Sequence, residues 1–188
     1  MNTVDEETVR RAVAFATEKH RGQFRIGGDP YITHPVAVAE IVRQDGWGTD
    51  GIVAALFHDL LEDTDAAESE IRAIGGAAVL EAVRRLTKRK GRPMAEYIEA
   101  IRANPIAFAV KGADRLHNLT CAVCASEEFK RKYVLESVDW YLDFRREIPG
   151  AVRTLVHSME SPLASLPLQY RLINENAELI QPASTDCK

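Results

Sequence analysis

Apolar side chains recur at helical spacing along most of the chain. Asp5 is placed to cap a helix that runs to about His20, with apolar residues at intervals of three and four positions. Thr33 is predicted to cap a second helix, which has Pro35 in its first turn and ends at Gly46. The sequence lacks the sustained two-residue alternation that is typical of half-buried strands. The pattern therefore predicts an all-α fold, a single helical bundle.

The most apolar helix is predicted to start at Thr49 or Asp50 and to continue unbroken through the segment GIVAALFHDLLED. Because it is apolar on most sides, it is expected at the centre of the core. Glycine and proline residues divide the next part of the chain into shorter helices. These are expected over about Ser69–Ile74, Ala77–Leu86, Pro93–Ala103, Asn104–Val123 and Glu127–Ile148, with a basic loop at Lys88–Arg92. Asn104 is predicted to cap its helix, with Pro105 in the first turn.

The C-terminal part carries helical signals but no interpretable motif. Pro149 and Gly150 are expected to interrupt the preceding helix, further helical turns are expected over about 150–180, and residues 181–188 are expected to fray. The 188 residues contain no repeat or low-complexity tract. One domain is therefore expected over 1–188, with its motifs within about 5–145.

Composition narrows the class of protein. A hydrophobic share of 46% and a charged share of 28% are ordinary for a globular domain and argue against disorder. Neither a run of 18 apolar residues nor a secretory signal is present, so no membrane segment is expected. A formal charge of −4 argues against binding to nucleic acid, which needs a broad basic surface. Three cysteines, an odd number, favour a reducing cytoplasm over a disulfide framework.

Ionisable residues occur within the most apolar helix, in the segment HDLLED. Helical spacing places His58 above Glu62 and Asp59 above Asp63. An ordinary explanation is a pair of acids at a helix end, but carboxylates at a C-terminus oppose the helix dipole. Burying four ionisable groups without pairing or a metal would be costly, so this segment favours a functional site.

Four polar residues of the segment VKGADRLHNL share one helix face at spacings of three and four positions: Lys111, Asp114, Arg115 and Asn118. Taken alone, an internal Lys–Asp or Asp–Arg ion pair explains this face better than a binding site does. The role of His117 stays open. His20 and His157 have no flanking carboxylate pattern and are interpreted as structural.

Four residues from three segments together suggest a metal site: His34, His58, Asp59 and Asp114. Two imidazoles and two carboxylates suit a divalent cation such as Mn²⁺, Fe²⁺ or Co²⁺, with open positions for water or a phosphate oxygen. By itself, a histidine before Pro35 is more often structural, so the hypothesis depends on the whole set. Cys121 and Cys124 form a single C-x-x-C without a second ligand pair, which does not indicate a thiolate zinc site.

The order of these four residues resembles that of the HD-domain metal-dependent phosphohydrolases. Longer segments narrow the resemblance to the hydrolase domain of the Rel/SpoT alarmone enzymes, especially the small stand-alone (p)ppGpp hydrolases. The segments are HRGQFRIGGDPYITHP (20–35), FHDLLEDT (57–64), LTK (86–88) and VKGADRLHNL (110–119). The similarity covers about residues 5–145.

The resemblance implies Mn²⁺-dependent hydrolysis of the 3′-pyrophosphate of ppGpp or pppGpp, which gives GDP or GTP and pyrophosphate and lowers alarmone levels. The residues implied to hold one Mn²⁺ are His34, His58, Asp59 and Asp114. The acids implied to orient or deprotonate the attacking water are Glu62 and Asp63. For the substrate, the resemblance implies base contact by Arg25, contact with the ribose-phosphate region by Asn118, and support from Lys111 and Arg115. The basic loop is interpreted as solvated surface rather than as a phosphate ligand.

The chain departs from the family pattern where substrate would be contacted. The usual Arg-Lys-Ser-Gly reads Arg25-Ile26-Gly27-Gly28, and the usual Met-Arg-Thr after Asn118 reads Leu119-Thr120-Cys121. Each change removes a basic side chain, so a phosphohydrolase of another nucleotide is the alternative. A non-catalytic nucleotide-binding or partner-binding domain is less favoured, because all six metal and water residues are present. Gly112 stands where the family usually has a Leu, in a helix interior. Glycine there lowers the stability of the helix by about 1 kcal/mol relative to Ala.

Overall fold

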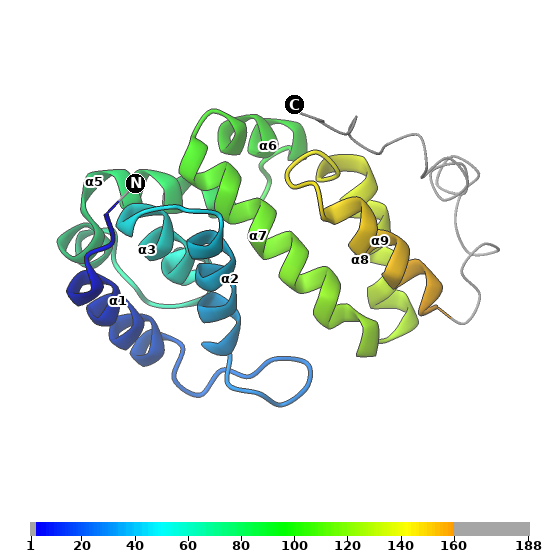
Figure 1. Cartoon of the computed structure of the whole chain (residues 1–188), viewed down its shortest axis with the longest axis horizontal. Helices are drawn as coiled ribbons and strands as arrows, with labels where there is room; N and C mark the ends of the chain where they lie inside the picture. The colour runs from blue at the N-terminus through cyan, green and yellow to red at the C-terminus, as the bar shows by residue number, and fades with distance from the viewer. Residues whose placement is uncertain (1–2, 160–188) are drawn as a thin grey trace, which may run out of the picture.

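The computed structural model describes residues 3–159, and these fold into helices (Figure 1). The helices are α1 (Glu6–Lys19), α2 (Thr33–Gln44), α3 (Thr49–Phe57), α4 (Leu60–Asp63), α5 (Glu68–Leu86), α6 (Met94–Arg102), α7 (Pro105–Cys121), the 3₁₀ helix η1 (Ala122–Cys124), α8 (Glu127–Trp140) and α9 (Ile148–His157). Within this range the chain forms no strand, only an isolated bridge between Phe24 and Pro30. The predicted all-α fold is confirmed.

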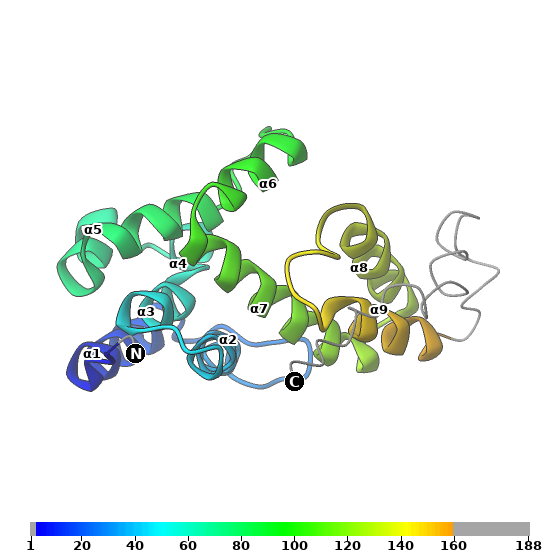
Figure 2. The ribbon, with the colours of Figure 1, turned by 45° about the horizontal axis from the view of Figure 1, so that its top comes forward.

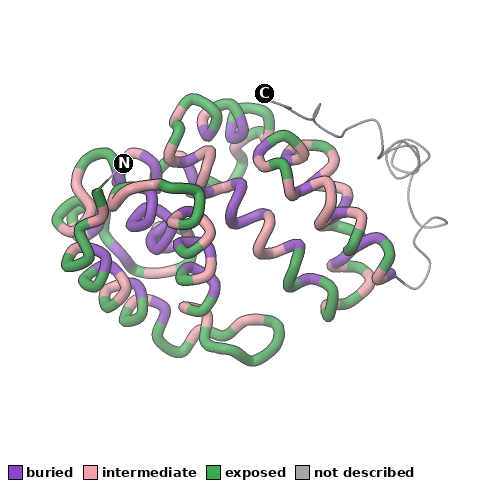
Figure 3. The backbone as a smooth tube through the Cα atoms, in the orientation of Figure 1, coloured by how far each residue is buried: buried purple, intermediate pink, exposed green. Residues whose placement is uncertain are grey.

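Helix α7 connects the two sides of the bundle. It packs against α2, α3, α5 and α6 on one side and against α9 on the other, and α8 packs on α9 (Figures 1 and 2). Helix α3 lies inside the first group and is buried at every residue from Gly51 to Phe57 (Figure 3). The prediction that the most apolar helix occupies the core is therefore confirmed. In the described part of the chain, no helix is long and apolar enough to cross a membrane.

Two of the three predicted N-terminal caps are present. The Asp5 carboxylate accepts hydrogen bonds from the backbone N–H groups of Glu7 and Thr8, and the Asn104 side chain accepts one from Ala107. The prediction for Thr33 is wrong. Thr33 is already the first residue of α2, and its hydroxyl donates to the carbonyl of Pro30, 2.8 Å away.

The unbroken helix predicted from Thr49 to Asp63 is also wrong. Helix α3 ends at Phe57, and α4 begins at Leu60 after a turn at His58 and Asp59. In a continuous helix, consecutive side chains diverge by about 100° around the axis and cannot face one target. The turn instead brings His58 Nε2 within 3.0 Å of Asp59 Oδ2. The break thus directs two adjacent polar side chains to the same place.

Of the predicted helix breaks, the one at Gly75–Gly76 is present, whereas the one at Pro149 is not. The expected break at Gly75–Gly76 is a kink within α5, where Gly76 has φ 82°. The single helix expected over Glu127–Ile148 instead ends at Trp140. Pro149 lies in the first turn of α9, where its missing N–H costs nothing, so the prediction that it interrupts a helix is wrong. The helical turns expected beyond Met159 and the frayed tail lie outside the described residues.

Close packing explains the glycine inside α7. A Cβ built on Gly112 would lie 2.9 Å from the carbonyl oxygen of Phe144, in the segment between α8 and α9. We expect Gly112→Ala to destabilise the protein by about 1–3 kcal/mol, because the backbone clash outweighs the gain of about 1 kcal/mol in helix propensity. Urea unfolding at constant m-value measures this difference.

Gly150→Ala is the matched control for that substitution. A Cβ on Gly150 would meet only the Arg153 guanidinium, at 3.8 Å. The control should be neutral or slightly stabilising. Equal stabilities for Gly112→Ala and wild type would show that α7 and Phe144 are not held at this distance.

Candidate active site

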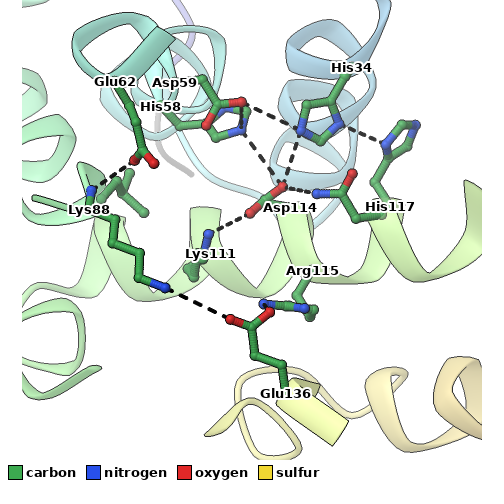
Figure 4. A network of polar contacts seen from close by, with 12 residues as sticks. His34, His58, Asp59, Glu62, Lys88, Lys111, Asp114, Arg115, His117 and Glu136 are labelled. Carbon is green, nitrogen blue, oxygen red and sulfur yellow. Dashed lines mark hydrogen bonds and ion pairs between the residues drawn. The ribbon is translucent and has the colours of Figure 1, made fainter. Parts of the chain in front are cut away.

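Three parts of the fold bring the four predicted metal ligands together (Figure 4). His34 comes from the first turn of α2, His58 and Asp59 from the turn between α3 and α4, and Asp114 from the middle of α7. His34 Nε2 lies 3.1 Å from Asp114 Oδ1 and 3.8 Å from Asp59 Oδ2. His58 Nε2 lies 3.0 Å from Asp59 Oδ2 and 3.8 Å from Asp114 Oδ1. Both imidazoles therefore face both carboxylates.

This donor set fits a divalent cation. His34, His58 and Asp59 each offer one ligand atom, and these atoms lie within 4.8 Å of one another. The His58 Nδ1 is 2.7 Å from the carbonyl oxygen of Ala55, which can only accept, so Nδ1 carries a proton. The opposite nitrogen, Nε2, is buried and has no hydrogen bond of acceptable geometry. When Nε2 gives up its proton, it therefore presents a lone pair to the cluster, as metal-binding histidines do.

The electrostatics of the cluster favour positive charge. Burial works to lower the pKa of His58, but the carboxylates of Asp59 and Asp114 raise it to about 9. Burial works to raise the pKa of Asp59, but His58 lowers it to about 2. Asp114 has a pKa well below its usual range despite burial, because Lys111 and the two imidazoles stabilise its carboxylate. The buried Asp114 and the partly buried Asp59 thus stay ionised, and such carboxylates are suited to hold a cation.

A tyrosine that the sequence had not singled out orients one of the carboxylates. The hydroxyl of Tyr31 donates to Asp59 Oδ2 at 2.6 Å. Burial and the neighbouring Asp59 and Asp63 raise the pKa of Tyr31 far above its usual range, so it remains a donor. Its ring packs against the buried His20, with centroids 4.7 Å apart. Tyr31 lay in the quoted segment before His34, but no local pattern indicated this contact.

His117, whose role the sequence left open, contacts the cluster through the Nδ1 side of the His34 ring and also lines the neighbouring cavity. Its Nδ1 lies 2.8 Å from the Nδ1 of His34 (Figure 4). Burial and the adjacent His34 lower the pKa of His117 to about 4, so the ring is neutral. Its position three residues after Asp114 was the available signal, since that spacing places it near the same helix face.

The two candidate acids differ in their surroundings. Glu62 lines the cavity in front of the cluster, and its Oε2 accepts the backbone N–H of Lys88 at 2.8 Å. Although Glu62 is accessible to solvent, partial desolvation raises its pKa. Asp63 lies beside Tyr31, 3.4 Å from its hydroxyl, and does not line that cavity. Desolvation and Asp59 raise the pKa of Asp63 as well.

The polar face of α7 divides into two parts. Lys111 and Asn118 both donate to Asp114, at 2.8 and 2.6 Å, so the internal ion pair considered from the sequence does exist. Arg25, from the loop after α1, donates to the Asn118 side chain at 3.1 Å. Arg115 turns towards α8, where its guanidinium contacts Glu136 at 2.9 Å. Arg25 and Asn118 therefore lie together next to the cluster, whereas Arg115 lies deeper on the α8 side.

A cavity of about 880 Å³ opens in front of these residues. Its walls include all the predicted metal and substrate residues together with Glu62, and the basic side chains on it are Arg25, Lys88, Lys111, Arg115 and Lys132. Part of the basic loop, Lys88, thus reaches the cavity. Arg89 and Lys90 line a smaller hollow of about 390 Å³ that also adjoins Glu62. The exposed Cys121 and Cys124 lie on the cavity wall.

Curated relatives carry sequences similar to this chain. It is 34% identical to guanosine-3′,5′-bis(diphosphate) 3′-pyrophosphohydrolase of Haemophilus influenzae, over 82% of this chain and 24% of the relative. It is 32% identical to the bifunctional (p)ppGpp synthase/hydrolase SpoT of Escherichia coli, over 89% of this chain and 25% of the relative. The GTP pyrophosphokinase rsh of Brucella melitensis is 30% identical, over 97% of this chain and 27% of the relative. The chain thus spans about a quarter of the length of these relatives.

A solved structure and a family description agree with the geometry. The chain is similar to a metazoan orthologue of SpoT, described as hydrolysing ppGpp, with a TM-score of 0.58 and 25% identity over 95% of this chain and 99% of that one. A sequence model described as HD domain matches residues 12–147. That range contains the paired histidines and aspartates of the cluster. The chain therefore belongs to the HD-domain family.

Proposed function

We propose that this protein hydrolyses the 3′-pyrophosphate of ppGpp or pppGpp and releases pyrophosphate with GDP or GTP. The observation that carries the proposal is the convergence of His34, His58, Asp59 and Asp114 on the wall of one cavity, with Glu62 beside them. The similarity to the pyrophosphohydrolase and SpoT relatives, and to the metazoan orthologue of SpoT, supports this choice of substrate.

The resident cofactor of the proposed reaction is one Mn²⁺, for which Fe²⁺ or Co²⁺ can substitute, held by these two imidazoles and two carboxylates. Such an ion, when bound, lowers the pKa of water and polarises a phosphoryl oxygen. The protein's own residues prepare the site. Tyr31 fixes the Asp59 carboxylate, and Lys111 and Asn118 fix that of Asp114. These contacts hold the carboxylates in place before any ligand enters.

In this proposal Glu62 takes the proton of the attacking water. Its raised pKa makes its carboxylate a stronger base than an ordinary glutamate, and the backbone N–H of Lys88 holds it at the cavity wall. Asp63 supports the site from the side of Tyr31.

Arg25 and Asn118 are proposed to bind the base and the ribose-phosphate region, because they lie in contact next to the cluster. The cavity wall carries five basic side chains and five carboxylates, those of Asp29, Asp59, Glu62, Asp114 and Glu136. An anionic nucleotide would therefore be bound by local positive charge, as at Arg25, rather than by a net positive wall. Lys111 and Arg115 already pair with Asp114 and Glu136, so they are assigned supporting roles. We place the protein in the cytoplasm, where its nucleotide substrate would occur.

A phosphohydrolase of another nucleotide is the second candidate, and one feature favours it. Ile26, which stands where the family usually has a lysine, is 72% exposed on the cavity wall. An apolar side chain there offers no charge to a substrate phosphate. A non-catalytic binding domain is less favoured, because the cluster and Glu62 are intact.

Turnover of a nucleotide panel under Mn²⁺ tests the proposal. The purified protein is incubated with ppGpp, pppGpp, deoxynucleoside monophosphates and a 2′-phosphorylated dinucleotide, and the products are separated by anion exchange. We expect ppGpp and pppGpp to give pyrophosphate with GDP or GTP, with kcat/KM at least about tenfold above that of the other substrates. If a monophosphate is consumed while ppGpp stays intact, the second candidate is correct. Turnover of none of these substrates would favour the binding domain.

A further inference from the structure

His34 and His117 contact each other through the Nδ1 atoms of their two rings. Their Nδ1 atoms lie 2.8 Å apart, and their ring centroids lie 4.9 Å apart (Figure 4). Two neutral imidazoles at this distance must share one proton, because one nitrogen donates and the other accepts. The tautomer of His117 therefore decides which ring nitrogen of His34 carries a proton.

His34 and His58, the two histidines of the cluster, differ in the group that their Nδ1 atoms contact. His58 is backed by the Ala55 carbonyl, which accepts from Nδ1 and leaves Nε2 free for the cluster. His34 has no such backbone acceptor and is backed by a side chain. For His34 Nε2 to bind a cation, the proton of this ring must sit on Nδ1, and the Nδ1 of His117 must accept it.

The far side of His117 is compatible with that arrangement. When its Nδ1 accepts, its own proton sits on Nε2, which lies 3.7 Å from the sulfur of Cys121. A thiol sulfur is a weak acceptor at that distance. In this arrangement His34 donates to His117, and His117 donates to the sulfur of Cys121. All the donors therefore point away from the cluster.

We propose that His117 is a positioning residue, which fixes the orientation and the tautomer of His34 so that Nε2 faces the cation. The inference rests on the metal site of the proposed function. In this account His117 lines the cavity wall but acts on the ion only through His34. Outer partners of metal-binding histidines typically change metal affinity by about 10–100-fold when they are removed.

Two substitutions separate this role from simple packing. His117→Asn places an amide oxygen close to the position of Nδ1, where it can accept from His34. His117→Gln is equally polar but extends its amide towards the position of Nε2, away from His34. His117→Phe keeps the ring volume and removes the acceptor. We expect Mn²⁺ affinity, measured by calorimetry on the metal-free proteins, to fall about 10–100-fold for Gln and Phe and less than about threefold for Asn.

The measurement distinguishes failure of this inference from failure of the metal site. If the wild-type protein binds no Mn²⁺, the metal site itself is wrong. If the wild type binds Mn²⁺ and the Gln and Asn variants bind it equally, the positioning role is wrong. Thermal unfolding of the metal-free variants shows whether each is folded, and the Asn–Gln comparison stands even if the Phe variant does not fold.

Turnover at saturating Mn²⁺ supplies a second readout. If His117 acts only through His34, excess Mn²⁺ should restore kcat of His117→Gln to within about threefold of the wild-type value. A kcat that stays low when the metal site is full would mean that His117 takes part in the reaction directly, which overturns a purely positioning role.

Discussion

Asp59→Ala is expected to abolish cation binding and hydrolysis together, while the helical content of the protein remains. One oxygen of Asp59 lies 3.0 Å from His58 Nε2 and 3.8 Å from His34 Nε2, so the carboxylate serves both imidazoles. The substitution removes a ligand and a negative charge, and the loss in Mn²⁺ affinity should exceed the roughly 100-fold upper range for an outer-shell change. Calorimetric titration with Mn²⁺ and a pyrophosphate-release assay measure the two effects.

Two further variants make this result interpretable. Asp59→Asn keeps the volume and an acceptor for the Tyr31 hydroxyl but loses the charge, so it should stay folded and still bind Mn²⁺ poorly. Asp65→Ala removes a carboxylate that is 89% exposed and pairs with Lys19, and it should leave binding and turnover unchanged. Wild-type Mn²⁺ affinity in both Asp59 variants would show that the ion, if any, binds elsewhere.

The helical framework of the site could be predicted because its signals are local. Asp5 and Asn104 cap α1 and α7 through their own neighbours in sequence, and the apolar residues of α3 mark it as the core helix. Residue types alone also nominated the cluster, since paired histidines and carboxylates in apolar surroundings need a partner or a metal. The spacing of residues along the sequence could not predict that α2, the end of α3 and α7 lie side by side.

The break after Phe57 shows why local periodicity was not enough. The segment from Thr49 to Asp63 keeps a helical pattern, so nothing in it predicts the turn at His58 and Asp59. The turn is stabilised by contacts with distant residues, namely Tyr31 with Asp59 and Asp114 with both imidazoles. Such tertiary contacts override propensity where a site needs adjacent side chains to face one point.

Tyr31 and Glu136 were missed for the same reason. Tyr31 lies in a loop 28 positions before Asp59, and Glu136 lies in α8, 21 positions after Arg115. In its own segment, neither residue belongs to a pattern that indicates a functional site. Only the packing of α9 on α7, and of α8 on α9, brings Glu136 against Arg115. There it also lies 4.0 Å from the Lys88 ammonium group. A single sequence carries no signal for pairs at such separations.

Glu62→Gln is expected to keep Mn²⁺ affinity within about threefold of wild type and to lower kcat by about 10²–10⁴-fold, the usual contribution of a general base. Glu62 lines the cavity but is not one of the four residues of the cluster. The amide retains the size of the side chain and an oxygen that can accept from the Lys88 N–H, so the local backbone should not move. Only the capacity to take a proton is lost. Steady-state kinetics on ppGpp at saturating Mn²⁺ measures kcat and KM separately.

The role of Glu62 is assigned by comparing the effect of the substitution on kcat with its effects on KM and on Mn²⁺ affinity. A base acts in the transition state, so kcat should fall while KM for ppGpp changes little. Glu40→Gln, on the exposed part of α2 beside Arg43, is the matched control and should leave both constants unchanged. If Glu62→Gln loses the metal as well, Glu62 is a ligand. If its kcat is that of wild type, the proton passes to another group, and the acid beside Tyr31, Asp63, becomes the residue to replace next, because its carboxylate also has a raised pKa.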